Sequence, residues 1–468
     1  MLRVFRHYIP KTLLILGAAE ALIFLVSVYI GGTVHVAHFG ALGGAASTTL
    51  DGPMFPKATL FTLIMLAVMM AMGLYQRDLR YGSQSLLIRL SLSFVVGVMV
   101  MLALSKGYPE FSVGGGAFSI ALLASFLGIA SCRFLCMPRT DTQLRHRVLV
   151  LGVGNRAKNI SRLRRRSDQH GVTIVGFVDL GVGPRVVDAH NIWTVRTSLW
   201  ELAERHQVDE IVVALDDRRN KLPISDILEC KMRGIEVLDE AGFFERQLGK
   251  IRLDSLHPSN VIFSDGFTQA ILKPGSKRLF DMIASLALTV LAAPIMLITA
   301  LAIVIESGGK GPVFYTQERV GKNGRIFRVH KFRSMQVDAE ADGVAQWASQ
   351  NDDRITRVGR IIRKTRIDEL PQLWNVLAGD MSFVGPRPER PEFVADLTRD
   401  LPYYSLRHHV KPGITGWAQI CYSYGASLED SREKLQYDLY YLKNYSLFLD
   451  LTILVQTVQV ILWGKGSR

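Results

Sequence analysis

Cysteine is scarce in this sequence, and none of the four cysteines belongs to a CxxC pair. Cys132 and Cys136 lie one helical turn apart inside an apolar stretch, where packing is a more common role than metal binding. The pattern argues against a zinc or disulfide framework and fits a reducing compartment. Tyrosine is absent between Tyr108 and Tyr315. Because short-chain dehydrogenases and dehydratases need a tyrosine with a lysine four residues later, that chemistry is excluded for the middle of the chain.

Charge is nearly absent from four apolar stretches near the start of the chain, at about 12–31, 58–75, 85–105 and 117–137. Each is close to the roughly 20 residues that a helix needs to cross a bilayer, so we predict four spans. The first is too long for a signal peptide and lacks a small-residue cleavage site. Lys and Arg gather before the first stretch, between the second and third, and after the fourth. The positive-inside rule therefore places both ends of the bundle in the cytosol.

Acidic residues are fewer than basic ones, 42 against 55, which gives a net charge of +13. The basic residues lie beside the apolar stretches and in the C-terminal third, which suits anionic headgroups and phosphorylated substrates better than nucleic acid. A chain of 468 residues is long enough for several domains. We predict a four-helix membrane region over 1–140, an α/β domain over 141–250, a linker over 251–275 and a last domain over 276–468.

Residues 146–250 alternate apolar strands with helical patterns, which is typical of a parallel, Rossmann-like α/β domain. Gly152 and Gly154 begin a G-x-G-x-x-A turn between a strand and a helix, and Asp179 closes the next strand. This is the position of the dinucleotide fingerprint, where glycines let a pyrophosphate approach a helix N-terminus. The same glycines also suit a turn that binds no ligand, and the sequence leaves both alternatives open.

A fifth apolar stretch, residues 282–305, contains no charge and is long enough to span a bilayer. The residues that follow, 306–335, carry seven Lys and Arg against two Glu, and a crossing helix would move them outside, against the positive-inside rule. Pro294 lies in the middle, where a proline removes a backbone hydrogen bond and kinks the helix. We therefore predict a re-entrant helix, at about 279–306, that returns to the side it came from. An ordinary span is the alternative.

Two adjacent carboxylates, Asp368 and Glu369, stand just before Pro371. A proline is tolerated in the first turn of a helix, so we predict a helix that starts at about 368–370 and ends at Leu377. The pair then lies at a helix N-terminus, where the dipole and free N–H groups stabilise anions. A capping role explains the pair without chemistry, and spacing alone favours that role over catalysis.

Cationic residues flank this pair in the sequence. Residues 311–335 predict a hairpin with its turn at Gly321–Gly324, and Lys331 and Arg333 then fall on one face of the second strand. Arg387 is held between two prolines, and its planar guanidinium suits phosphate. A solvated sheet face is the alternative to a phosphate-binding edge for the hairpin residues.

Residues 435–463 mix aromatic, acidic and apolar side chains, and Asp438, Lys443 and Asp450 interrupt the apolar pattern. We therefore expect helices that lie on the membrane and do not cross it.

Taken together, several short motifs resemble the bacterial sugar transferase family, the monotopic polyprenyl-phosphate phosphoglycosyl transferases. The resemblance covers about 275–468, and one departure is Ala293-Pro294, where members of the family often have Ser-Pro. The motifs, in family order, are Lys277-Arg-Leu-Phe-Asp281, Lys331-Phe-Arg-Ser-Met335, Asp368-Glu-Leu-Pro-Gln-Leu-Trp-Asn375, Gly385-Pro-Arg-Pro388, Pro412-Gly-Ile-Thr-Gly-Trp417 and Tyr437-Asp-Leu-Tyr-Tyr-Leu442.

The resemblance implies that the protein transfers a sugar-1-phosphate from a nucleotide-diphosphate sugar, by default a UDP-hexose, to polyprenyl phosphate and releases NMP. It implies that Asp368 is a nucleophile that forms a phosphosugar-aspartyl intermediate. Glu369 would bind Mg²⁺ together with Asp368, or assist proton transfer.

For the cations, we assign Arg387 to the sugar-nucleotide phosphates and Lys331 and Arg333 to the diphosphate or the lipid phosphate, and we expect Arg366 to bind substrate phosphate as well. Large members with a four-span bundle and a Rossmann-like domain start exopolysaccharide or O-antigen assembly, which implies the cytoplasmic face of a bacterial inner membrane and a homodimer. The expected fold class is thus a membrane protein: an α-helical four-span bundle, a Rossmann-like α/β domain, and an α/β catalytic domain anchored by a re-entrant membrane helix.

Two rival functions come from other classes. A channel or transporter gated by a nucleotide-binding domain would need a selectivity filter or charges within the spans, and the loop Ser112–Gly116 lacks the filter pattern. A non-catalytic scaffold for polysaccharide assembly would leave the Asp-Glu pair purely structural.

Overall fold

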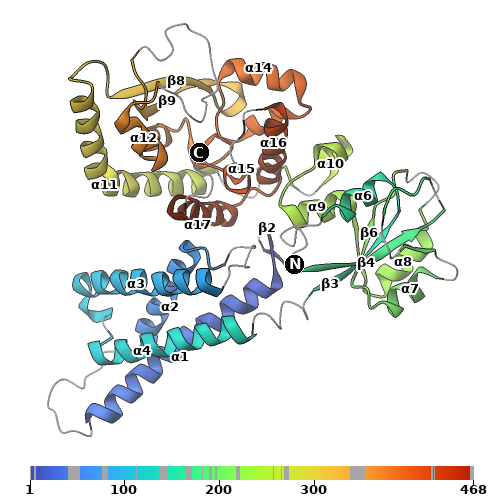
Figure 1. Ribbon diagram of the computed structural model, residues 1–468, viewed down its shortest axis with the longest axis horizontal. Helices are drawn as coiled ribbons and strands as arrows, with labels where there is room; N and C mark the ends of the chain where they lie inside the picture. Colours follow the sequence, from blue (N-terminus) through green and yellow to red (C-terminus); the bar gives the residue numbers. More distant parts are fainter. Residues whose placement is uncertain are drawn as a thin grey trace. The chain divides into compact units, whose positions relative to one another are not determined.

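The structure of the protein is a computed structural model, shown in Figure 1. It describes residues 2–4, 7–40, 53–75, 83–111, 113–136, 145–163, 171–181, 183–188, 192–194, 198–217, 222–256, 258–264, 266–267, 274–337, 354–422, 425 and 427–463. The basic loop between the second and third apolar stretches, used above to orient the bundle, lies outside the described residues. The chain divides into two compact units: the first ends at Leu248, and the second begins at Gly249 and also includes His7.

The four predicted apolar stretches of the first unit are helical. They follow two short strands, and their interior is an apolar cluster in which Phe24 and Phe61 pack edge to face, 5.7 Å apart. Outward side chains such as Leu63 and Met99 are mostly exposed, as expected for residues that face lipid. The elements are β1 (Leu2–Val4), β2 (His7–Ile9), α1 (Lys11–Gly40), α2 (Met54–Ala71), α3 (Ser83–Gly107) and α4 (Gly115–Ser131).

One ion pair is buried within these helical stretches. Glu20 of α1 is fully buried, and the guanidinium of Arg133 lies 2.6 Å from its carboxylate. Arg133 also donates to the carbonyl of Leu74 at 3.0 Å, and Tyr75 donates to Glu20. A buried charge is costly in lipid unless it is paired and hydrogen-bonded. The ion pair between Glu20 and Arg133 therefore links α1 to the segment that follows α4.

The rest of the first unit is the predicted parallel α/β domain. Its strands follow the order β5-β4-β3-β6-β7, all parallel, and apolar clusters fill both faces of the sheet. The elements are β3 (His146–Leu151), α6 (Asn155–Ser161), β4 (Val172–Asp179), β5 (Ile192–Thr194), α7 (Leu199–Arg205), β6 (Glu210–Val213), α8 (Ile224–Met232), β7 (Glu236–Asp239) and α9 (Glu240–Leu248). The three-residue strand β5 was not predicted, because so short a run carries no period-2 pattern.

The second unit is an α/β domain built around α16. Its largest apolar cluster includes Ile251 and Leu253, so part of the segment expected to be a linker belongs to this core. The elements are α10 (Pro258–Phe263), α11 (Pro274–Glu306), β8 (Phe314–Val320), β9 (Ile326–Phe332), α12 (Arg357–Lys364), α13 (Gln372–Ala378), β10 (Ser382–Val384), α14 (Pro391–Asp400), β11 (Gly413–Thr415), α15 (Trp417–Cys421), α16 (Leu428–Lys443) and α17 (Leu447–Trp463).

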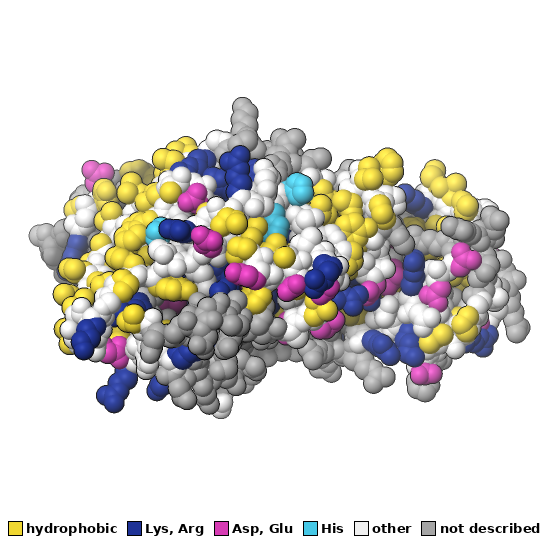
Figure 2. All heavy atoms as spheres, turned by 90° about the horizontal axis from the view of Figure 1, so that it is seen from above, with side chains coloured by type: hydrophobic (Ala, Val, Ile, Leu, Met, Phe, Trp, Pro, Cys, Tyr) yellow, Lys and Arg dark blue, Asp and Glu magenta, His cyan; other side chains and the backbone are white. Residues whose placement is uncertain are grey.

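Helix α11 is long, apolar and bent, and Figure 1 shows its two arms running in different directions. Pro294 lies inside it. Among the described residues five helices are long and apolar enough to cross a membrane, and Gly275–Glu306 is the fifth. Its side chains Leu291 and Ile305 are more than 70% exposed. Such exposed hydrophobic side chains are also visible on the face shown in Figure 2.

Another expectation is corrected by helix α16. Residues 435–463 were expected to form helices lying on the membrane, because Asp438, Lys443 and Asp450 interrupt their apolar pattern. Instead, Leu435 and the run from Asp438 to Leu442 are buried in the core of the second unit. The acid that interrupts the apolar pattern, Asp438, is paired inside the protein, with Arg407 2.8 Å away. Asp438 therefore belongs to a buried ion pair and does not lie at a membrane surface.

Candidate active site

Asp368 and Glu369 lie in a tight 3-10 turn, Ile367–Glu369, and helix α13 starts only at Gln372. The predicted helix therefore begins later than expected, because Pro371 takes the capping position before it. No side-chain capping hydrogen bond is present at either the turn or the helix. The capping explanation for the acidic pair is thus not supported by the geometry.

The residue that leads into this turn has an unusual backbone. Arg366 has φ +59° and ψ +15°, the left-handed region that residues with a Cβ adopt only when neighbouring structure holds them there. Such strain clusters at functional sites. In this chain it turns the Asp368-Glu369 segment inward, so that both acids are only 8% exposed.

Three cations converge on one oxygen of Glu369. The Oε1 atom lies 2.7 Å from a guanidinium nitrogen of Arg387, 3.3 Å from Nζ of Lys331 and 3.7 Å from a guanidinium nitrogen of Arg366. Burial alone would raise the pKa of Glu369, but the three positive charges outweigh it and hold that pKa well below its usual range. Glu369 is therefore ionised at any physiological pH.

Its neighbour Asp368 is in the opposite electrostatic situation. Burial and the adjacent charge of Glu369 raise the pKa of Asp368 to about 6, although Lys331, Arg366 and Arg387 act against that shift. Its Oδ1 atom is buried and has no hydrogen-bond partner among the described residues. Two neighbouring acids with pKa values pushed apart are typical of groups with separate chemical roles. An unpartnered carboxylate oxygen beside three cations is suited to attack a phosphorus atom.

Strand β9 delivers one of the predicted phosphate-binding residues but not the other. The predicted hairpin is confirmed, with β8 and β9 antiparallel. Asn375 holds β9 in place: its amide oxygen accepts from the N–H of His330 at 3.0 Å, and its Nδ2 donates to the carbonyl of Arg328 at 2.7 Å. This fixes Lys331 against Glu369. Burial lowers the pKa of Lys331, while Glu369 works against that effect.

Arg333 is not brought to the acidic pair. Strand β9 ends at Phe332, and the backbone N–H of Arg333 donates to Val313 O at 2.9 Å just beyond it. The guanidinium of Arg333 instead donates to the carbonyl of Lys310 at 3.0 Å. Among the described residues, the side-chain contact of Arg333 is thus with Lys310 and not with Asp368 or Glu369, and its role at the substrate phosphates stays a prediction.

Arg387 is positioned by backbone contacts between two glycine-containing loops. Strands β10 and β11 pair in parallel, and beyond them Gly385 N donates to Thr415 O at 2.9 Å and Gly413 N to Pro386 O at 3.0 Å. A Cβ on Gly413 would collide with the backbone of Gly385. The glycines thus serve this close backbone contact, which sets the start of the rigid Pro-Arg-Pro turn.

A buried ion pair between Arg407 and Asp438 supports the backbone of Arg387. Arg407 donates to Asp438 and also to the carbonyl of Arg387, at 2.9 Å. Sequence reasoning assigned neither residue a role, although Asp438 lies in one of the quoted motifs. The available signal was a charged residue at an apolar-patterned helix position, since an acid that is buried there needs a partner.

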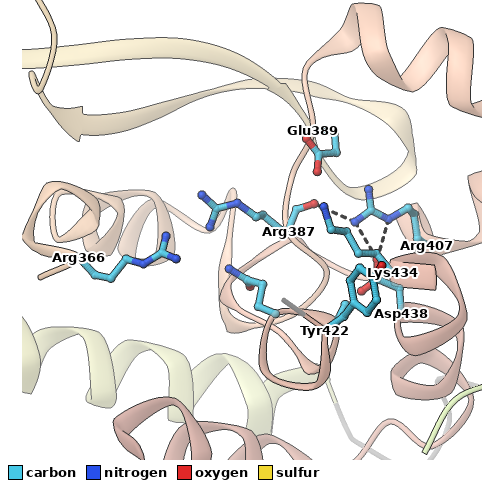
Figure 3. Close-up of a pocket in the computed structure, with 9 residues that line it drawn as sticks. Arg366, Arg387, Glu389, Arg407, Tyr422, Lys434 and Asp438 are labelled. Atoms are coloured by element: carbon cyan, nitrogen blue, oxygen red, sulfur yellow. Dashed lines mark hydrogen bonds and ion pairs between the residues drawn. The ribbon is translucent and has the colours of Figure 1, made fainter. Parts of the chain in front are cut away.

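A pocket opens beside these residues in the second unit. Figure 3 shows Arg366 and Arg387 reaching toward one another on one side, with Arg407, Lys434 and Asp438 gathered on the other. One side of the pocket is therefore strongly cationic and adjoins the acidic pair, as a binding site for a nucleotide diphosphate requires. The lining residues are Arg366, Arg387, Glu389, Arg407, Ala418, Gln419, Tyr422, Lys434 and Asp438.

The start of α11 is locked to the elements that carry the site. Lys277 lies 2.6 Å from Asp450 and donates to Val384 O, at the end of β10. Arg278 donates to the carbonyls that end α13, and Asp281 accepts from Ser382 Oγ and Phe383 N at 3.1 Å. The apolar helix is therefore rigidly joined to both the Asp368 and the Arg387 segments.

The glycine turn of the first unit already holds an anion from the chain itself. The carboxylate of Asp216 accepts from the backbone N–H groups of Asn155 and Arg156, both at 2.8 Å, and lies against Gly154. Asp179 accepts from Gly181 N and Arg185. The N–H groups that a pyrophosphate would use are thus occupied. Gly152 has φ +123°, and a Cβ added there would lie 2.6 Å from Ala214 O, so the turn itself requires this glycine.

Comparison with known proteins agrees with the motifs. The family described as "Bacterial sugar transferase" matches residues 272–464. The UDP-N-acetylgalactosamine-undecaprenyl-phosphate N-acetylgalactosaminephosphotransferase of Aeromonas hydrophila is 44% identical over 242 residues, 52% of this chain and 56% of that protein. The match thus spans little more than half of the Aeromonas protein.

Two further relatives are matched over most of their length. The UDP-glucose:undecaprenyl-phosphate glucose-1-phosphate transferase of Xanthomonas campestris pv. campestris is 31% identical over 380 residues, 78% of this chain and 75% of that protein. The undecaprenyl-phosphate glucose phosphotransferase of Komagataeibacter xylinus is 32% identical over 380 residues, 79% of this chain and 69% of that protein. The chain therefore belongs to the bacterial sugar transferase family.

Proposed function

We propose that the protein transfers a sugar-1-phosphate from a UDP-sugar to undecaprenyl phosphate, releases UMP and so starts the assembly of an exopolysaccharide or O-antigen. The observation that carries the proposal is the unpartnered Oδ1 of Asp368 beside Glu369 and its three cations. The names of the relatives, which include glucose and N-acetylgalactosamine phosphotransferases, supply the substrate class.

In the first step, the Asp368 carboxylate attacks the β-phosphorus of the donor. The bond from that phosphorus to the bridging oxygen breaks, UMP leaves with the electron pair, and an aspartyl-phosphosugar remains. In the second step, a phosphate oxygen of undecaprenyl phosphate attacks the same phosphorus and releases the carboxylate. Covalent catalysis divides one difficult transfer into two, so the soluble donor product leaves before the lipid reacts.

The cations make the first step electrostatically possible. A carboxylate and a diphosphate repel one another, and positive charges preorganised at the reacting phosphorus offset that repulsion. Arg387 and Arg366 face the pocket, and Lys331 stands beside the acidic pair. Since Glu369 remains ionised, we assign it the role of holding these cations in place and not that of a proton donor.

The acidic pair also fits a Mg²⁺ ion that arrives with the diphosphate. Mg²⁺ is commonly bound by one or two carboxylates together with substrate phosphates. No cluster of three or more acidic, His or Cys side chains suitable for a metal occurs in the described part of the chain, so a substrate-independent site is not indicated. The second carboxylate oxygen of Asp368 and that of Glu369 would hold the ion and leave Asp368 Oδ1 for the attack, and the ion would neutralise phosphate charge when bound.

The bend in α11 supports a re-entrant helix. A helix that turns back within one leaflet keeps the residues at both of its ends on the same side of the membrane, where the positive-inside rule places them. The site then lies at the cytoplasmic surface of the bacterial inner membrane, where a soluble donor meets a lipid acceptor. The homodimer implied by the resemblance belongs to the same proposal and is checked by the mass of the detergent-solubilised protein.

The experiment is UMP release from purified protein in nanodiscs containing undecaprenyl phosphate, with a panel of UDP-sugars. Wild type should release UMP with at least one sugar, whereas Asp368→Asn should release none while folding normally. Turnover by Asp368→Asn would remove the nucleophile assignment. Absence of UMP release by wild type with every donor would favour the scaffold alternative.

A further inference from the structure

Helix α12 presents a cationic face for which the described structure offers no partner. Arg357, Arg360, Ile361 and Lys364 are exposed, and their spacing of three and four residues places them on one side of the helix. Among the described residues, none forms an ion pair with these three cations. Ile361 is 63% exposed in the middle of them. A basic face with an exposed aliphatic side chain is typical of a helix that lies at a membrane surface.

The opposite face of α12 fixes it to the end of the apolar helix. The carboxylate of Glu306, the last residue of α11, accepts from the N–H groups of Arg357 at 2.7 Å and Val358 at 3.2 Å, so it caps the start of α12. Ile362 packs with Ile303 of α11 in a common apolar cluster. These contacts place α12, and with it the cationic face, next to the end of α11.

We propose that this face of α12 binds the phosphate groups of anionic phospholipids at the membrane surface. The inference rests on the membrane position proposed above for α11. If α11 enters the bilayer and returns, Glu306 marks its exit, and α12 lies at headgroup level. Three unpaired cations then meet the negative surface potential of the leaflet, and Ile361 reaches toward the acyl boundary while the longer basic side chains extend to the phosphates.

Lipid binding at this face has a consequence for the active site. Helix α12 ends at Lys364, and Arg366 and Asp368 follow within four residues. Anchoring α12 to headgroups therefore sets the height and orientation of the catalytic turn relative to the lipid phosphate plane. An anionic membrane should accelerate the step in which undecaprenyl phosphate reacts, more than the step that uses the soluble donor.

The test is hydrogen–deuterium exchange of the full-length protein in nanodiscs of phosphatidylcholine, with and without phosphatidylglycerol. We expect the amides of α12 to exchange roughly tenfold more slowly in the anionic discs, since three cations contribute. The variant Arg357→Gln/Arg360→Gln/Lys364→Gln should lose this protection but match wild type in phosphatidylcholine, which shows that its helix is intact. The charge-preserving variant Arg357→Lys/Arg360→Lys/Lys364→Arg should keep the protection, and so should Arg205→Gln/Arg233→Gln/Arg399→Gln, which removes three exposed cations elsewhere.

The result does not depend on turnover. Asp368→Asn in anionic discs should show the wild-type protection of α12, so a failure of the proposed reaction would leave this readout intact. Equal exchange of α12 in the two kinds of disc would overturn the proposal. So would protection by undecaprenyl phosphate in phosphatidylcholine without any effect of phosphatidylglycerol, because the face would then be an acceptor site and not a phospholipid contact.

Discussion

Replacing Asp368 by Asn should remove activity and at the same time stabilise the protein. The pKa of Asp368 is raised from 3.8 to about 6, so the folded state disfavours its ionised form. At 1.36 kcal/mol per pKa unit, the difference amounts to about 3 kcal/mol of lost stability once the group is ionised in both states. Asn lacks the charge, so the variant should recover about this amount above pH 6.

The sign of the pH dependence follows from the direction of the shift. Below pH 3.8 the carboxyl group is protonated in the folded and unfolded states, so it costs nothing. Between pH 3.8 and about 6 the unfolded state loses its proton first, and the destabilisation grows until it is complete above the folded pKa. The advantage of the Asn variant should therefore be full at pH 7.5 and shrink toward zero near pH 4.

Thermal unfolding in detergent, followed by tryptophan fluorescence across this pH range, measures the effect. For a unit of this size, about 3 kcal/mol corresponds to a rise of roughly 6–12 °C in Tm. Glu369→Gln is the matched control and should act in the opposite direction, because it leaves Arg387, Lys331 and Arg366 facing one another without their anion. A lower Tm for Asp368→Asn at pH 7.5, or a gain that does not vary with pH, would refute the reasoning.

Four further outcomes are expected. The kcat of wild type should fall about tenfold per pH unit below about pH 6, as Asp368 becomes protonated, and a profile flat to pH 5 would contradict this. Arg387→Lys should lower kcat/KM by roughly 10- to 100-fold in UMP-release kinetics, since an ammonium cannot replace the guanidinium fork, and near-wild-type kinetics would argue against phosphate contact. Pro294→Leu should let part of the population cross the membrane, so that a cysteine placed at Lys310 becomes labelled from outside in cells, unlike in the parent. NAD⁺ should cause no shift in Tm, because Asp216 occupies the N–H groups of the glycine turn, and a shift that disappears in Asp179→Asn would show a dinucleotide site.

Much of the fold was predictable because its signals are local. The apolar stretches, the hairpin around Gly321–Gly324 and the parallel α/β pattern each follow from spacing within a short window. Two of the misjudged features depended on distant partners. α16 was expected at a membrane surface because its acid Asp438 interrupts the apolar pattern. Its burial depends on Arg407, which pairs with Asp438 from more than 30 residues away. Arg333 was expected beside the acidic pair, but its guanidinium donates to the carbonyl of Lys310, which precedes strand β8.

The site was predictable in its residue types but not in its electrostatics. Sequence spacing alone favoured a helix cap for the acidic pair, and it could not distinguish Asp368 from Glu369. The distinction arises because three cations from separate segments meet on one oxygen of Glu369 and leave Asp368 Oδ1 without a partner. Likewise, the glycine turn of the α/β domain had the pattern of a nucleotide site, and only the fold reveals that Asp216 fills it.

The most direct test of the central claim is to trap the covalent intermediate. Purified protein in lipid free of undecaprenyl phosphate is incubated with an accepted UDP-sugar, and its intact mass and the released UMP are measured together. We predict a mass increase of one sugar phosphate, located to the peptide that contains Asp368, with one UMP released per protein and loss of the adduct when undecaprenyl phosphate is added. UMP release that requires undecaprenyl phosphate and leaves the protein unmodified would contradict this prediction.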